Sequence, residues 1–139
     1  MRNIIYLGTL MLFCSCDPEV CTEEKISNSS DVDIVINWFY IDSRINNRTV
    51  KINKNTGISD ETCAMGGVIV NYNAIYDSVV VKSPKNKVLK VWTSETKGRN
   101  IYNIDRDWVV RETSKNHFVY TFEITNEDLI IEKRKKSIK

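Results

Sequence analysis

Histidine, proline and glycine are scarce in this chain of 139 residues, which has one His, two Pro and five Gly. A Ser-His-Asp or Cys-His catalytic centre would therefore depend on His117 alone, and no G-x-S-x-G motif accompanies it. The glycine-rich motifs that hold phosphates or dinucleotides, G-x-x-x-x-G-K-[ST] and G-x-G-x-x-G, are also absent. The sequence therefore supports neither an enzymatic activity nor a bound cofactor, and we expect none of either.

A strong excess of one charge is lacking as well, since 20 Lys and Arg stand against 18 Asp and Glu. Five of the basic residues lie in the last eight positions (EKRKKSIK), which leaves 14 basic and 17 acidic residues in 16–131. A nucleic-acid binder needs a basic face on its folded domain, so we expect no nucleic-acid partner. The carboxylate pairs Asp105/Asp107 and Glu127/Asp128 have the residue types of a glycosidase, but with 18 acidic residues such pairs arise by chance.

Long apolar runs are missing, and the one short run lies at the N-terminus. Arg2 precedes the apolar segment 4–13 (IIYLGTLMLF). Ten helical residues rise about 15 Å, roughly half of a 30 Å hydrocarbon core, so the segment is too short for an ordinary transmembrane helix. A basic residue, a short apolar core and the small Ser15 are typical of a signal peptide. We predict that residues 1–15 are removed.

The stretch Phe13-Cys14-Ser15-Cys16 resembles the bacterial lipobox, with Cys16 at the invariant cysteine. The resemblance implies a diacylglycerol on Cys16 and a partner in the lipid bilayer, while Cys14 leaves with the signal peptide. The alternative is a secreted protein cut near Ser15. Acidic residues then follow, and they resemble the surface-export signal of Bacteroidetes lipoproteins: Asp17, Glu19, Glu23 and Glu24. This resemblance implies an outer-membrane protein exposed at the cell surface.

The body of the chain alternates apolar and polar residues in short segments, which is the pattern of half-buried β-strands. The expected strands are 32–40, 49–52, 77–82, 87–93, 108–113 and 117–125, with 68–72 as a candidate central strand. Turn residues separate them at 46–47, 83–86 and 114–116. No window has a sustained helical period. The sequence predicts an all-β fold, an antiparallel two-sheet sandwich of immunoglobulin- or transthyretin-like type, with a small barrel as the alternative.

These segments divide the chain into four parts. After the signal peptide (1–15) we expect a lipidated polar tether (16–31), the β-sandwich domain (32–131) and a basic C-terminal tail (132–139). Terminal runs of charge are usually solvated.

Cys21 and Cys63 are the two cysteines left beyond Cys16. An even pair in an oxidising compartment predicts a disulfide, which would close a loop of 43 residues and pin the tether to the sandwich. The alternative is two buried free thiols. We expect no metal, because structural zinc takes four ligands and His117 is the only histidine.

Adjacent aromatic residues suggest a binding surface. Trp38, Phe39 and Tyr40 cannot all face the core of one strand, and exposed Trp or Tyr rings stack on sugars or anchor protein partners. We therefore predict ligand contacts at Trp38 and Tyr40. Asp77-Ser78-Val79 resembles the D-[ST]-[apolar] O-glycosylation site of Bacteroidetes, which implies modification at Ser78.

The lipobox and the ending YTFEITNEDLI together resemble small surface lipoproteins of the Bacteroidetes, a resemblance that carries no active residues. The expected function is therefore a non-catalytic outer-membrane lipoprotein that binds glycan or protein at the surface. The alternative is a periplasm-facing lipoprotein of structural, inhibitor or immunity type.

Overall fold

The computed structural model describes residues 18–67 and 70–129, so the expected lipid acceptor Cys16 lies outside the described part. In chain order the elements are β1 (Glu19–Asn28), β2 (Ile34–Tyr40), β3 (Arg48–Ile52), β4 (Thr56–Met65), α1 (Tyr72–Ile75), β5 (Tyr76–Lys82), β6 (Val88–Trp92), α2 (Ile104–Asp107), β7 (Val109–Ser114) and β8 (His117–Ile124).

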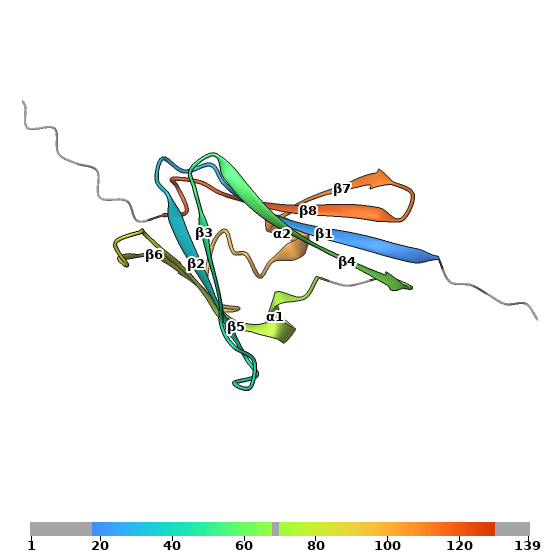
Figure 1. Ribbon diagram of the computed structural model, residues 1–139, viewed down its shortest axis with the longest axis horizontal. Helices are drawn as coiled ribbons and strands as arrows, with labels where there is room; N and C mark the ends of the chain where they lie inside the picture. The colour runs from blue at the N-terminus through green and yellow to red at the C-terminus, as the bar shows by residue number, and fades with distance from the viewer. Residues whose placement is uncertain (1–17, 68–69, 130–139) are drawn as a thin grey trace, which may run out of the picture.

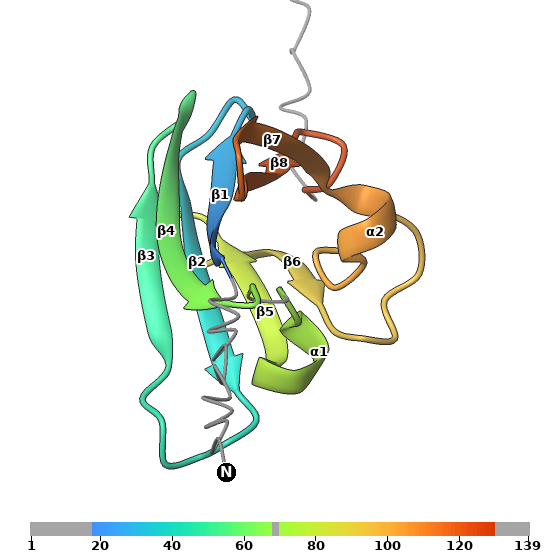
Figure 2. The same cartoon turned by 90° about the vertical axis from the view of Figure 1, so that its right-hand side faces the viewer.

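The strands form two four-stranded sheets, in the orders β4-β1-β8-β7 and β3-β2-β5-β6, which pack against each other (Figures 1 and 2). The predicted all-β two-sheet sandwich is confirmed. Pairing is antiparallel except between the central strands β1 and β8, which run parallel. The parallel pair joins segments from the two ends of the described chain.

The core lies between the sheets and is built from the alternating apolar residues that the sequence indicates. In β2 the side chains of Ile34, Ile36 and Trp38 are at most 2 % exposed. Phe122 and Ile124 of β8 are fully buried on the facing sheet. Burying one large apolar side chain stabilises the fold by roughly 1.5–3 kcal/mol, and this burial holds the two layers together.

Asparagines close three of the turns. Asn55, Asn86 and Asn116 have φ values of 57°, 63° and 62°, a left-handed conformation that Asn tolerates better than most residues. The predicted turns at 83–86 and 114–116 are two of these, and the first is closed by a hydrogen bond from Ser83 N to Lys87 O at 2.8 Å.

Two strands lie where the sequence suggested none. Residues 19–28, assigned above to a polar tether, form β1, which pairs with β4 on one side and β8 on the other. The predicted domain start at residue 32 is therefore wrong. Cys63, expected in a connection, lies in the ten-residue strand β4.

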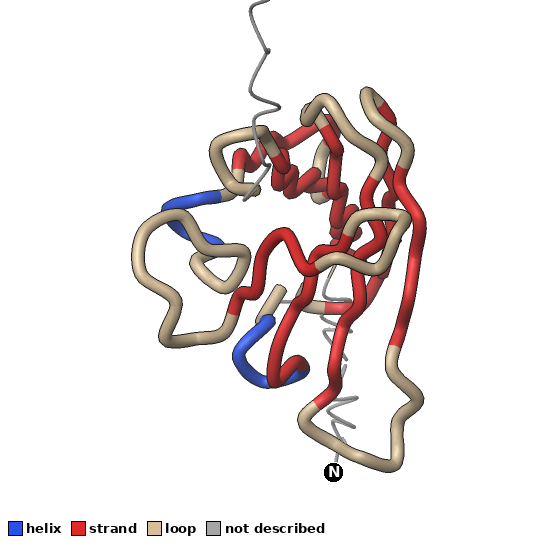
Figure 3. The backbone as a smooth tube through the Cα atoms, turned by 90° about the vertical axis from the view of Figure 1, so that its left-hand side faces the viewer, coloured by secondary structure: helices blue, strands red, loops and turns tan. Residues whose placement is uncertain are grey.

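The candidate strand at 68–72 is also wrong at its C-terminal end, and residues 68 and 69 lie outside the described part. Tyr72 begins the single-turn helix α1 because Asn71 caps it, its Oδ1 accepting from Ala74 N at 3.2 Å. Figure 3 shows both short helices at one side of the strands.

Among the described residues, no helix has the length and apolar character needed to cross a membrane.

Candidate functional site

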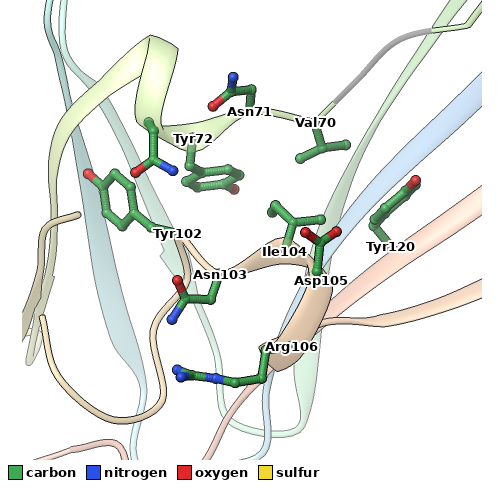
Figure 4. A pocket seen from close by; sticks show the side chains of 10 residues that line it. Val70, Asn71, Tyr72, Tyr102, Asn103, Ile104, Asp105, Arg106 and Tyr120 are labelled. Atoms are coloured by element: carbon green, nitrogen blue, oxygen red, sulfur yellow. The ribbon is translucent and has the colours of Figure 1, made fainter. Parts of the chain in front are cut away.

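An open pocket of about 520 Å³ lies between α1 and α2. We call it the α1–α2 pocket. It is lined by Val70, Asn71, Tyr72, Asn73, Tyr102, Asn103, Ile104, Asp105, Arg106 and Tyr120. Figure 4 shows the α1 side above, the α2 side below, and Tyr120 of β8 at one flank. Its lining combines tyrosine rings with side-chain amides and two charged groups.

Aromatic packing fixes the α1 side of this pocket. The ring of Tyr72 is 3 % exposed and packs against Tyr102 at 6.0 Å, Tyr76 at 5.0 Å and Trp108 at 5.5 Å between centroids. Tyr102 donates its hydroxyl to Tyr76 O at 3.2 Å, and burial raises its pKa to about 12. Tyr72 and Tyr102 therefore form a neutral, rigid floor rather than exposed stacking rings.

The α2 side is held by the buried side chain of Asn100. Its Nδ2 donates to Thr93 O at 2.8 Å and Thr96 O at 3.0 Å, and its Oδ1 accepts from Tyr102 N at 3.2 Å. The indole of Trp108 adds a hydrogen bond to Ile101 O at 2.8 Å. These bonds order the loop that delivers Tyr102 and Asn103 to the pocket.

Asp107 anchors α2 from outside the pocket. Its Oδ2 accepts from Asn100 N at 2.8 Å and pairs with Arg106 Nη2 at 2.7 Å. Hydrogen bonds from Arg106, from Asn100 N and from Asn103 lower the pKa of Asp107 to about 2, against the effect of burial. Arg106 also donates to Gly98 O at 2.5 Å, so its guanidinium is committed to the loop.

Several polar groups at the rim remain open to a ligand. Among the described residues, Asn73 and Asp105 have no hydrogen-bond or ion-pair partner, and both are exposed. The cap of α1 uses the amide oxygen of Asn71, which leaves its NH₂ group free to donate to a ligand. Tyr120 is half-buried and supplies a ring at the flank. The pocket thus offers donors, acceptors and one ring edge or face.

A second, smaller pocket of about 180 Å³ shares Tyr72 and contains the Glu24 cluster, which we define as Glu24, Arg48, Asp60, Tyr72 and Tyr76. Glu24 and Asp60 lie opposite each other on β1 and β4. Burial, and then the charge of Asp60, raise the pKa of Glu24, while a hydrogen bond from Tyr72 and the charge of Arg48 oppose the shift.

Within that cluster Arg48 serves as the internal cation. It pairs with Asp60 at 2.5 Å, and its guanidinium carbon lies 5.2 Å from the centre of the Trp38 ring. Burial is also the main reason that the pKa values of Tyr72 and Tyr76 are raised. The cluster holds its own counter-ion, and we interpret it as the polar end of the core.

The structure separates the residues that the sequence singled out for binding. Trp38 is 2 % exposed, so its prediction as an exposed stacking ring is wrong: its position in the alternation of β2 points it inward. Tyr40 is half-buried and packs on Tyr76 at 4.9 Å, away from the α1–α2 pocket. Ser78 is half-buried in β5, paired with Phe39, and its modification stays a prediction.

The disulfide prediction is confirmed, because Cys21 and Cys63 are bonded at 2.04 Å across the β1–β4 pair. In each carboxylate pair considered for catalysis, one member has structural partners. Asp107 binds Arg106, and Asp128 binds Arg99 and accepts from Thr125 N at 2.9 Å. His117 lies beside Glu61 and does not line the α1–α2 pocket.

Of the residues that line the α1–α2 pocket, the sequence drew attention only to Asp105, as half of a carboxylate pair that was attributed to chance, and it predicted none of them as a ligand contact. A signal was present in the repeated Tyr-Asn dipeptide, at Tyr72-Asn73 and Tyr102-Asn103, each at a break between strand patterns. Only the fold brings the two dipeptides to the same pocket, because they lie 30 residues apart.

Fold and site together define a disulfide-bonded β-sandwich with a polar, tyrosine-floored pocket at one side. No family model, curated protein or solved structure matches the chain.

Proposed function

We propose that this chain is a non-catalytic lipoprotein of the outer membrane that binds a glycan in the α1–α2 pocket. The observation that carries the proposal is the pocket itself: a preformed hollow with a rigid aromatic floor and unpartnered polar groups at its rim. Small-ligand sites are usually preformed concavities with a few convergent polar groups. Sugars present both hydroxyl groups and apolar ring faces, which Asn73, Asp105 and Tyr120 can meet.

The non-catalytic character is supported by how the ionisable side chains are used. The single histidine lies outside the pocket, and Arg106 and Asp107 are bonded to each other and to the loop. Asp105 is the one carboxylate at the rim. Hydrolysis of a glycoside commonly needs two carboxyl groups across the scissile bond.

Export is supported by the disulfide between Cys21 and Cys63, because disulfides persist in oxidising compartments such as the bacterial envelope. The lipobox-like stretch ending at Cys16 supports attachment to the membrane. At ~0.8 kcal/mol per buried CH₂, two or more acyl chains hold a protein firmly at the bilayer.

Binding is tested on a glycan array, followed by titration calorimetry with any glycan retained. We expect Asn73→Ala and Asp105→Asn each to weaken binding about two- to tenfold, the net value of one hydrogen bond. Both side chains are exposed, so neither change should disturb the fold.

The matched control is Asn46→Ala, which removes an exposed amide from the turn between β2 and β3 and should leave affinity unchanged. A failure to retain any glycan, or retention that the Asn73→Ala/Asp105→Asn double variant does not alter, would contradict the proposal.

Attachment is tested by feeding cells an alkyne fatty acid. We expect the wild-type chain to be labelled and Cys16→Ala to be unlabelled, since the thiol that accepts the lipid is gone. Cys14→Ala is the control and should be labelled as the wild type is. Loss of label in Cys14→Ala instead would show that Cys14, and not Cys16, accepts the lipid.

The alternative, a periplasm-facing inhibitor or structural lipoprotein, is favoured by one feature. Strand β7 is an edge strand whose six residues are all exposed, including Val109 and Val110. Such an edge can add a strand from a partner protein. Protease added to intact cells distinguishes the two, because only the surface orientation leaves the chain open to cleavage.

A further inference from the structure

The outer face of the sheet β4-β1-β8-β7 brings together four residues of metal-binding types. Cys21 of β1 is opposite Cys63 of β4 and opposite His117 of β8. Glu61 lies two residues before Cys63, on the same face of β4. We call Cys21, Cys63, Glu61 and His117 the outer-face cluster.

The ligand atoms of three members of this cluster already converge, and the fourth member, His117, lies beside one of them. One atom each of Cys21, Glu61 and Cys63 lies within 4.8 Å of the others, and His117 Nε2 is 3.1 Å from Glu61 Oε1. A tetrahedral zinc ion with bonds of ~2.0–2.3 Å has ligand atoms about 3.3–3.8 Å apart. The spacing of the Cys21, Glu61 and Cys63 atoms is therefore close to that of a zinc site, and His117 lies next to it.

His117 is an independent indication that something is missing from this face. Its Nε2 atom is buried and, among the described residues, makes no hydrogen bond. It is within ion-pair distance of Glu61 but lacks hydrogen-bond geometry. Buried polar atoms in native proteins nearly always have a partner. An imidazole nitrogen beside a carboxylate, on the strand next to Cys21, fits a metal ion.

We propose that the reduced chain binds one Zn²⁺ through Cys21, Cys63, His117 and Glu61, so that this face alternates between a disulfide and a zinc site. Two thiolates, an imidazole and a carboxylate are ligands that zinc accepts in tetrahedral geometry, and the soft sulfur atoms select against Mg²⁺ and Ca²⁺. The site goes beyond the proposed glycan binding and is independent of it.

The redox step uses a dithiol as the reductant. The dithiol gives two electrons and two protons to the Cys21–Cys63 disulfide and becomes a disulfide itself, leaving two protein thiols. Zn²⁺ then displaces one proton from each thiol and binds the two thiolates. Cys63 is exposed, so a dithiol can reach the bond without unfolding the sheet.

Zinc and the disulfide compete for the same sulfur atoms, so each must oppose the other. At a free zinc concentration 100 times the dissociation constant, the ratio of dithiol to disulfide should rise about 100-fold. A surface ion pair between His117 and Glu61 would show no such coupling.

The test uses the full chain in detergent with Cys14→Ser and Cys16→Ser, which removes the other two thiols. After reduction with a phosphine, Co²⁺ is added as a spectroscopic substitute for zinc. We expect one equivalent to bind, with sulfur-to-cobalt charge-transfer bands and the intense visible bands of a tetrahedral site. Zinc should then displace the cobalt and bleach these bands.

Variants separate the cluster from the thiols alone. His117→Ala should weaken cobalt binding by more than the ~10-fold loss typical of a change outside the ligand shell, and Glu61→Gln should weaken it and alter the visible bands. Glu95→Gln, an exposed carboxylate in a distant loop, is the matched control and should bind as the parent does. Equal binding by His117→Ala, or by the unreduced chain, would overturn the proposal.

Loss of fold on reduction is covered by a second measurement. If the reduced chain loses its circular-dichroism signal, zinc should restore it, because the metal would bind only the folded register. A reduced chain that neither binds cobalt nor refolds with zinc would also overturn the proposal.

Discussion

Two buried asparagines, Asn28 and Asn100, show how single residues set the loops of this sandwich. Both are 0 % exposed. Asn28 Nδ2 donates to Val32 O at 2.9 Å and to Ile52 O at 3.3 Å, while its Oδ1 accepts from Ser30 N at 3.1 Å. Asn100 does the same for the loop before α2. Each amide satisfies backbone groups that would otherwise be buried without partners. Leaving one such group unpaired would cost roughly 1–3 kcal/mol.

Glu24 is the residue whose charge works against the fold. Its folded pKa is raised above the ordinary 4.5 because it is buried, so the folded chain holds the proton more tightly than the unfolded chain does. The stability contributed by the protonated carboxyl is therefore fully present below pH 4.5, the unfolded pKa, and is lost as the pH rises through the folded pKa. We expect Glu24→Gln to melt at a higher temperature than the wild type at pH 7.

The gain should be smaller than the 4–8 °C that ~1 kcal/mol gives in a domain of this size, because the carboxylate is only partly buried. Thermal unfolding followed at several pH values checks it. Glu23→Gln changes the preceding residue, which lies on the opposite face of β1, and is the control. A Glu24→Gln variant that melts lower than the wild type at pH 7, yet matches it below pH 4.5, would show that the charge is stabilising.

At the scale of elements, alternation in hydropathy decided which strands could be predicted. Strands β2, β5 and β8 alternate because one face meets the core and the other meets solvent. Strands β1 and β4 escaped prediction because their inward faces are themselves polar: Thr22 and Glu24 point inward from β1, and Asp60 and Thr62 line the same pocket from β4. A strand whose inward face borders a polar pocket does not show the alternation of apolar and polar residues that predicts a strand.

How far the candidate sites could be predicted depended on whether their residues are brought together by pairing between distant strands. The disulfide was predictable, because two cysteines leave one pairing. The outer-face cluster was not, since Glu61 is one of 18 acidic residues and only the register of β4, β1 and β8 sets it beside Cys21 and His117. For the α1–α2 pocket, the apolar run ending at Tyr72 indicated a strand, and the capping by Asn71 decided otherwise.

For the molecule as a whole, β1 is the strand that completes one of the two sheets. It pairs along its length with β4 and with β8, and Ile26 joins the core. Without β1, the backbone groups of both neighbours would lose their partners and the core would lose one wall.

A pair of truncated chains tests this. A chain that starts at residue 18 should unfold in one cooperative thermal transition, followed by circular dichroism. A chain that starts at residue 32, where the sequence suggested the domain begins, should show none, because losing a central strand exceeds the ~5–15 kcal/mol by which a domain is stable. Equal transitions from both chains would show that β1 is dispensable.

If Cys16 carries the proposed lipid, the parallel β1–β8 pair also decides which end of the domain lies nearer the membrane. It makes the described chain enter at one end of the sandwich and leave at the other (Figure 1). A lipid on Cys16 would leave three residues to reach Glu19, or at most about 10 Å. The Cys21–Cys63 bond would then lie close to the headgroups. Strand β1, with ten residues, spans about 33 Å, so in an upright sandwich its far end would stand well beyond the ~8 Å screening length of physiological salt. A reductant or metal ion arriving from the bilayer surface would meet the cystine first, and a partner approaching from outside would meet the far end of the sheets.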